Sequence, residues 1–81
     1  MKVSVKVFPI AGVSDAAQEL EVTLSGEKLS ELIAFLQQRF SVDPRDESIM
    51  ILHNGQALDS YVDVILSEGD RLWMMPCLSG G

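Results

Sequence analysis

Only one segment of this 81-residue chain repeats its apolar residues with the spacing of a helix. Over residues 29–40, apolar side chains recur every three or four positions, and charged or amide side chains fill many of the positions between them. This spacing predicts one amphipathic helix of about three turns. Its apolar stripe consists of Leu29, Leu32, Ile33, Leu36 and Phe40. Because the helix has no second helix to pack on, we expect the stripe to be buried against a sheet.

Two segments before the helix alternate apolar and polar residues, which is the pattern of half-buried strands. They lie at residues 3–7 and 19–24, with the valines of the first segment on one face. Residues 9–16 between them include proline, glycine, serine and aspartate, a composition typical of a loop. The three segments together predict a β-hairpin.

After the helix, residues 49–53 are apolar on both faces, so their alternation does not identify the side that meets the core. The tight-turn pair Asn54-Gly55 leads into a short strand at residues 56–58. Residues 59–66 are expected to form a loop that has room for one helical turn, and residues 71–75 form the last strand.

The predicted order is therefore strand, strand, helix, strand, short strand, strand. Packing one helix on one face of a mixed sheet gives an α+β domain, and this order is that of the β-grasp, or ubiquitin-like, fold. We expect a single domain over residues 1–76 and a flexible C-terminal tail over residues 77–81.

The charge and composition narrow the classes of partner. Twelve acidic residues against six basic ones give a net charge of −6, which disfavours nucleic acid as a ligand. The same acidity favours either protein partners with basic docking surfaces or simple solubility. No apolar run approaches the ~20 residues of a membrane span, and the single Cys77 excludes an internal disulfide. A cytoplasmic location without membrane attachment is expected.

The sequence contains no recognisable catalytic or metal-binding pattern. His53 has no partner at catalytic spacing and is interpreted as a strand-end residue. Asp43, Asp46 and Glu47 surround a proline without EF-hand spacing, so they are interpreted as a solvated loop. Cys77 could form a transient persulfide or disulfide, but it lies in an acidic chain that disfavours its thiolate. We therefore expect neither an enzyme nor a bound metal or cofactor.

The C-terminal sequence Pro-Cys-Leu-Ser-Gly-Gly follows a Gly-Asp turn and an apolar strand. In these features, together with residues 5–8 and Asn54-Gly55, the chain resembles the MoaD/ThiS family of ubiquitin-like sulfur carriers. The chain departs from the family pattern in having Pro76-Cys77 where many members have two prolines, so the resemblance implies that Cys77 is a simple replacement for proline. The 9–16 loop also lacks the charged segment common in MoaD proteins. Both departures argue against a role in molybdopterin synthesis in particular. Neither argues against membership of the carrier class.

The resemblance implies that the working group is the carboxyl of Gly81. An E1-like enzyme is expected to adenylate it with ATP, and a sulfurtransferase then supplies the sulfur of a thiocarboxylate. Leu78, Ser79 and Gly80 would thread the tail into a partner's narrow active site, where glycine fits because it has no Cβ. The implied role is the small, non-catalytic subunit of molybdopterin synthase, partnered by the large subunit. The alternatives are a carrier for thiamin or tRNA thiolation, a ubiquitin-like modifier, or a plain interaction domain.

Three large apolar residues fall on the sheet face that alternation places away from the helix: Phe8, Trp73 and Met75. Large apolar groups on an exposed face usually mark an interaction site, so we interpret these residues as partner-binding. The alternative is that the 59–66 loop covers them.

Overall fold

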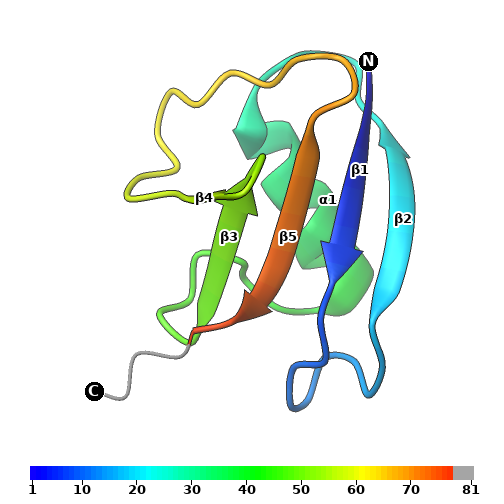
Figure 1. The fold of residues 1–81 in the computed structure, drawn as a ribbon, viewed down its shortest axis with the longest axis vertical. Coiled ribbons are helices and arrows are strands. Elements are labelled where there is room, and N and C mark those ends of the chain that lie inside the picture. Colours follow the sequence, from blue (N-terminus) through cyan, green and yellow to red (C-terminus); the bar gives the residue numbers. More distant parts are fainter. Residues whose placement is uncertain (78–81) are drawn as a thin grey trace.

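The computed structural model describes residues 1–77, which form five strands and one helix (Figure 1). In chain order the elements are β1 (Lys2–Val7), β2 (Gln18–Thr23), α1 (Leu29–Phe40), β3 (Ile49–His53), β4 (Gln56–Ala57) and β5 (Arg71–Pro76). This is the order predicted from the sequence. Within residues 1–77, no helix is both long and apolar enough to cross a membrane.

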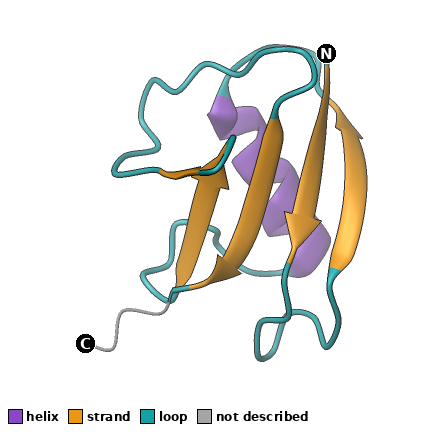
Figure 2. Ribbon diagram, in the orientation of Figure 1, coloured by secondary structure: helices purple, strands orange, loops and turns teal. Residues whose placement is uncertain are grey.

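The strands form one mixed sheet in the order β2-β1-β5-β3-β4. The first and last strands, β1 and β5, lie side by side in the centre and are parallel, whereas the other pairs are antiparallel. Helix α1 crosses one face of this sheet, and within residues 1–77 no helix covers the other face (Figure 2). The predicted α+β class and β-grasp fold are therefore confirmed.

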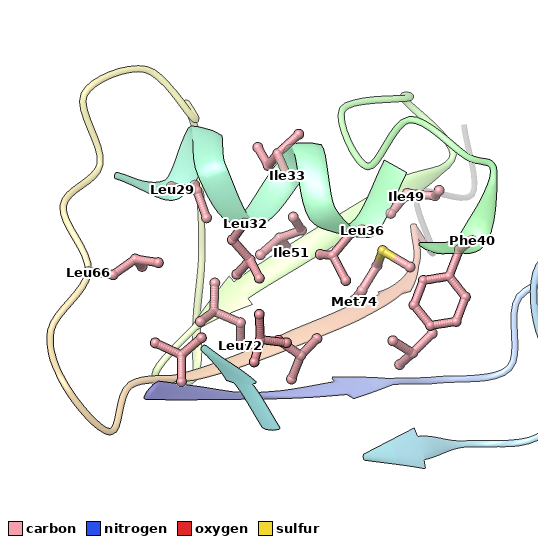
Figure 3. Packing of buried hydrophobic residues seen from close by; sticks show 14 of the residues in the cluster. Leu29, Leu32, Ile33, Leu36, Phe40, Ile49, Ile51, Leu66, Leu72 and Met74 are labelled. Carbon is pink, nitrogen blue, oxygen red and sulfur yellow. The ribbon is translucent and has the colours of Figure 1, made fainter. Parts of the chain in front are cut away.

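The core lies between α1 and the sheet (Figure 3). All five residues of the helical stripe are buried, as are the three valines of β1. In β3, Ile49 and Ile51 are buried in this core, which settles the inward face that the alternation left open. The register between β3 and β5 explains which face of β3 points inward, because Ile51 lies opposite Met74, which is itself buried.

The start of α1 is stabilised by backbone contacts and one acidic side chain. Lys28 at the N-cap makes no side-chain capping bond. Instead, the Leu29 N–H donates to the Val64 carbonyl oxygen at 3.0 Å. The Glu31 carboxylate accepts the backbone N–H groups of Ser25 and Gly26 at 2.7 and 2.9 Å. The hydrogen bond from Ser25 contributes most to lowering the pKa of Glu31, and the bond from Gly26 adds to it. Desolvation of the carboxylate acts in the opposite direction but does not outweigh these bonds.

The 59–66 segment is a loop, as predicted, and it does not contain the helical turn for which it had room. The end of the segment lies beside the residues just before α1, where Ile65 and Lys28 form an isolated antiparallel β-bridge. The Leu66 N–H donates to the Glu27 carbonyl oxygen at 2.7 Å, and the Leu66 side chain is buried in the core. The segment is therefore a loop that is held in place by the buried Leu66 side chain and by two backbone hydrogen bonds, from Leu29 to Val64 and from Leu66 to Glu27.

Candidate functional site

The face of the sheet opposite α1, here called the open sheet face, carries the outward-pointing side chains of β1, β5 and β3. Figure 1 is viewed onto this face, with α1 behind the strands. The register places Lys6 beside Trp73, and Trp73 beside Leu52. One row further along, Met75 lies beside Met50. The central strands thus present a continuous row of large side chains to the exterior.

Phe8 and Trp73 contact each other on this face. Their ring centroids are 5.5 Å apart with an interplanar angle of 61°, an edge-to-face contact. The Lys6 ammonium lies 5.0 Å from the centroid of the Phe8 ring. Trp73 remains 40% exposed, so the 59–66 loop does not cover it. The predicted outward placement is confirmed for Phe8, Trp73 and Met75, which we call the apolar cluster.

Met75 is the last residue but one of β5, the strand that leads into the tail, and the Phe8 N–H donates to the Met74 carbonyl oxygen at 2.9 Å. Pro76 is still paired with Ile49, and the Cys77 N–H donates to the Ser48 carbonyl oxygen at 2.8 Å. The main chain is thus hydrogen-bonded to the domain as far as Cys77. The four remaining site residues of the prediction lie outside the described residues: Leu78, Ser79, Gly80 and Gly81.

The loop after α1 contains the acidic residues that were interpreted as a solvated surface. The Arg45 guanidinium pairs with Asp43 at 3.0 Å, and Asp46 accepts the Ser48 N–H and hydroxyl at 2.9 and 2.7 Å. Each aspartate therefore serves the local turn. Among residues 1–77, no group of three potential metal ligands comes together.

The interpretation of His53 as a strand-end residue without a partner is wrong in one respect. Its Nε2 lies 2.7 Å from Oδ2 of Asp70, which also accepts the Ser67 N–H at 2.8 Å. The other carboxylate oxygen, Oδ1, accepts the Asn54 amide at 3.1 Å. Burial of the carboxylate raises the pKa of Asp70, but the hydrogen bonds from His53, Ser67 and Asn54 outweigh it and lower the pKa. The group joins the β3–β4 turn to the turn before β5.

Asp70→Asn should lower the free energy of unfolding by about 1–3 kcal/mol near neutral pH, because bonds to an ionised acceptor are lost. The pKa of Asp70 is lower in the fold than its unfolded value of about 3.9. Ionised Asp70 therefore stabilises the fold above that value, and the contribution is lost as the pH falls through the folded pKa. Urea unfolding of both proteins at several pH values should show their difference shrink below about pH 4.

The matched control is Asp59→Asn, which alters an exposed carboxylate without a hydrogen bond to any other residue in the 1–77 range. It should change the free energy of unfolding by less than about 0.5 kcal/mol. A difference between wild type and Asp70→Asn that stays constant down to about pH 2 would contradict the role of the ionised carboxylate.

A cavity of about 660 Å³ lies on the other side of the molecule, between α1 and the 61–65 segment. Its lining includes Ile33 from the helix and Tyr61 and Ile65 from the loop. Burial raises the pKa of Tyr61. Of the sequence-predicted site residues that the structure describes, namely Phe8, Trp73 and Met75, none lines this cavity. Sequence reasoning missed it because α1, Arg45 and the 61–65 segment, which are well separated in the sequence, form it only in the folded chain.

Comparison with known proteins gives a consistent set of relatives. The profile of the ThiS family matches residues 3–81. The molybdopterin synthase sulfur carrier subunit of Drosophila yakuba is 36% identical over 53 residues, which are 64% of this chain and 59% of that protein. The chain therefore aligns with less than two thirds of this relative's length.

Two solved structures share the fold over nearly the whole chain. One belongs to the complex of subunits 1 and 2 of the molybdopterin-converting factor from Helicobacter pylori 26695. It has a TM-score of 0.70 and 23% identity, and the match covers 100% of both chains. The other is the small archaeal modifier protein 1 from Methanosarcina acetivorans, with a TM-score of 0.68 and 26% identity. That match covers 99% of this chain and 96% of the modifier.

Proposed function

The chain belongs to the ThiS family, and we propose on this basis that it is a sulfur carrier that works through the carboxyl group of Gly81. The observation that carries the proposal is the extent of the family match, which runs from the first strand through Gly80-Gly81. Among residues 1–77 no potential metal cluster competes with this assignment, and the cavity of about 660 Å³ is not lined by Phe8, Trp73 or Met75. The folded domain then serves to present the tail to other proteins.

The chemistry requires activation by a separate enzyme. A free α-carboxyl group has a pKa of about 3.5, so at neutral pH it is an unreactive carboxylate. In the proposed reaction, its oxygen attacks the α-phosphate of ATP in an E1-like enzyme, and pyrophosphate leaves. Hydrosulfide released by a sulfurtransferase then attacks the acyl carbon of the adenylate, the bond from that carbon to the AMP oxygen breaks, and AMP leaves behind a thiocarboxylate. The carrier supplies the substrate carboxyl group and a docking surface, and the partner supplies the catalytic groups.

The pathway that we propose is molybdopterin synthesis. The sulfur carrier subunit of Drosophila yakuba, at 36% identity, supports this choice. The fold match to a chain in the complex of subunits 1 and 2 of a molybdopterin-converting factor supports a large-subunit partner. In this role the chain is a non-catalytic small subunit located in the cytoplasm, and its thiocarboxylate is consumed at the active site of the large subunit.

The apolar cluster is the proposed docking surface for the activating enzyme. A standard protein interface buries about 800 Å² on each partner, which the short tail over residues 77–81 does not provide. Trp73 is the type of residue on which binding energy concentrates, and it is 40% exposed at the centre of the open sheet face. Docking there leaves the tail, which continues from the end of β5, available to enter the partner.

The second candidate function is a ubiquitin-like modifier, in which the carboxyl group of Gly81 is joined to a lysine of a target protein. The fold match to a small archaeal modifier protein, at 26% identity, is the observation that favours it. Recovery of lysine-linked conjugates of this chain from cells, identified by mass spectrometry of the branched peptide, would establish this second function.

The carrier function is tested by incubating the chain with the E1-like enzyme, ATP and a sulfur donor. Intact-mass spectrometry should show a product in which one oxygen has been replaced by sulfur, and fragmentation should locate the change at Gly81. Cys77→Ser should give the same product, because the sulfur is placed on the terminal carboxyl and not on the thiol. Absence of the product from wild type, or its loss in Cys77→Ser, would contradict the mechanism.

A further inference from the structure

A shallow depression of about 260 Å³ lies on the open sheet face beside the apolar cluster. Trp73 forms one wall, and β1, β2 and β5 all contribute to the lining. Among residues 1–77, the lining consists of Ser4, Val5, Lys6, Glu19, Arg71, Leu72 and Trp73. The depression therefore joins the exposed indole to two cationic side chains.

These cations are concentrated on this face by the pairing of the strands. Of the six basic residues in the chain, three point outward from β1 and β5: Lys2, Lys6 and Arg71. The parallel register places Arg71 directly beside Ser4 and Lys6 beside Trp73. An overall charge of −6 thus coexists with a local concentration of positive charge at the proposed docking surface.

The acidic neighbours neutralise these cations only in part. Glu21 pairs with Lys2 at 3.7 Å, at a position outside the depression. Glu19 lines the depression opposite Lys6 in the register, but the two make no ion pair within 4 Å, and Lys6 lies over Phe8 instead. Within residues 1–77, the Arg71 guanidinium has neither a hydrogen-bond acceptor nor an ion-pair partner.

We infer that this depression binds an aspartate or glutamate side chain of the protein that docks on the open sheet face. The inference rests on the proposed function and specifies the chemistry of its partner. The Arg71 guanidinium matches a carboxylate in a two-point hydrogen bond, and the exposed Ser4 beside it carries a further donor. An apolar side chain next to that carboxylate would pack on Trp73. The partner is therefore acidic at this contact, the reverse of what the net charge of the chain suggests.

Charge reversal at Arg71 provides the direct test. The dissociation constant of the full-length chain for the E1-like activating enzyme is measured for wild type, Arg71→Glu and Arg71→Lys. We expect Arg71→Glu to weaken binding by at least about tenfold, and Arg71→Lys to weaken it less, because lysine keeps the charge but loses the planar fork. The affinity of wild type should fall with added salt, and that dependence should be smaller in Arg71→Glu.

Lys28→Glu is the matched control, because it makes the same change in charge at an exposed position on the helix side. Its dissociation constant should stay within about threefold of wild type, since its distance from the contact leaves only a screened effect. Circular dichroism and the unfolding midpoint establish that each variant is folded. Equal losses in Arg71→Glu and Lys28→Glu, or no loss in either, would overturn the inference.

Thiocarboxylate formation at saturating activating enzyme separates this inference from the proposed function. If wild type forms the product while Arg71→Glu binds as well as wild type, the acidic contact is wrong and the carrier function stands. If wild type binds the enzyme but forms no product, the carrier function is wrong, and the inference that rests on it is overturned as well. The expected result is product from both proteins, with Arg71→Glu requiring a higher enzyme concentration.

Discussion

Deletion of Gly81 is expected to abolish thiocarboxylate formation while leaving the folded domain intact. The variant ends in Gly80, so the terminal carboxyl group is withdrawn by about 3.5 Å of extended chain. A misplacement of only about 1 Å at a reacting centre can cost about 100-fold in rate. The adenylating enzyme should therefore yield no detectable product with the shortened chain in the time that wild type needs for complete conversion. Intact-mass spectrometry after incubation with ATP and a sulfur donor gives the measurement.

Binding provides the control for this deletion. The dissociation constant for the activating enzyme should change far less than the rate, because the apolar cluster lies on the folded domain and is untouched. Gly81→Ala tests the same step with the length preserved, because it adds only a Cβ where the tail must enter a narrow channel. A shortened chain that becomes thiocarboxylated at Gly80 as fast as wild type would show that the reaction does not depend on the length of the tail.

Local sequence patterns were sufficient to predict most of the elements of the fold and their buried faces. The stripe from Leu29 to Phe40 and the alternation around Val5 each constrain which face is buried, because a helix and a strand have different periods. For the strand at residues 49–53, the pattern did not predict which face is buried, because the segment is apolar on both faces. Its orientation is set by its register with β5, in which Ile51 lies opposite Met74. Such register is a property of two strands and is absent from either sequence segment alone.

The features of the site that sequence reasoning missed all arise from tertiary pairing. His53 and Asp70 are 17 positions apart and meet only because β3 and β5 lie side by side. Likewise, Arg71 comes to lie beside Ser4 through the parallel pairing of the first and last strands. Composition gave a net charge of −6, which favoured either basic partners or simple solubility, but it carries no information on where the six basic residues gather. The outward placement of Trp73 was predictable because alternation alone determines it.

Truncations of the core and of the open sheet face should separate folding from binding. Leu32 is fully buried between α1 and the sheet, so Leu32→Ala should lower the free energy of unfolding by about 2–5 kcal/mol. Trp73 is 40% exposed, so Trp73→Ala should instead cost about 1–3 kcal/mol of affinity for the activating enzyme. Its effect on folding should be smaller, because the indole mainly loses its edge-to-face contact with Phe8, worth about 0.5–1.5 kcal/mol.

Two measurements on each variant check this separation: the free energy of unfolding from urea titration and the dissociation constant for the activating enzyme. Phe8→Ala is the matched variant, since it removes the other ring of the same contact and should resemble Trp73→Ala in both measurements. Leu32→Ala should bind with nearly wild-type affinity wherever it remains folded, because its side chain lies on the opposite side of the sheet. If Trp73→Ala destabilises the fold as much as Leu32→Ala and binds normally, the indole supports the sheet and the docking surface lies elsewhere.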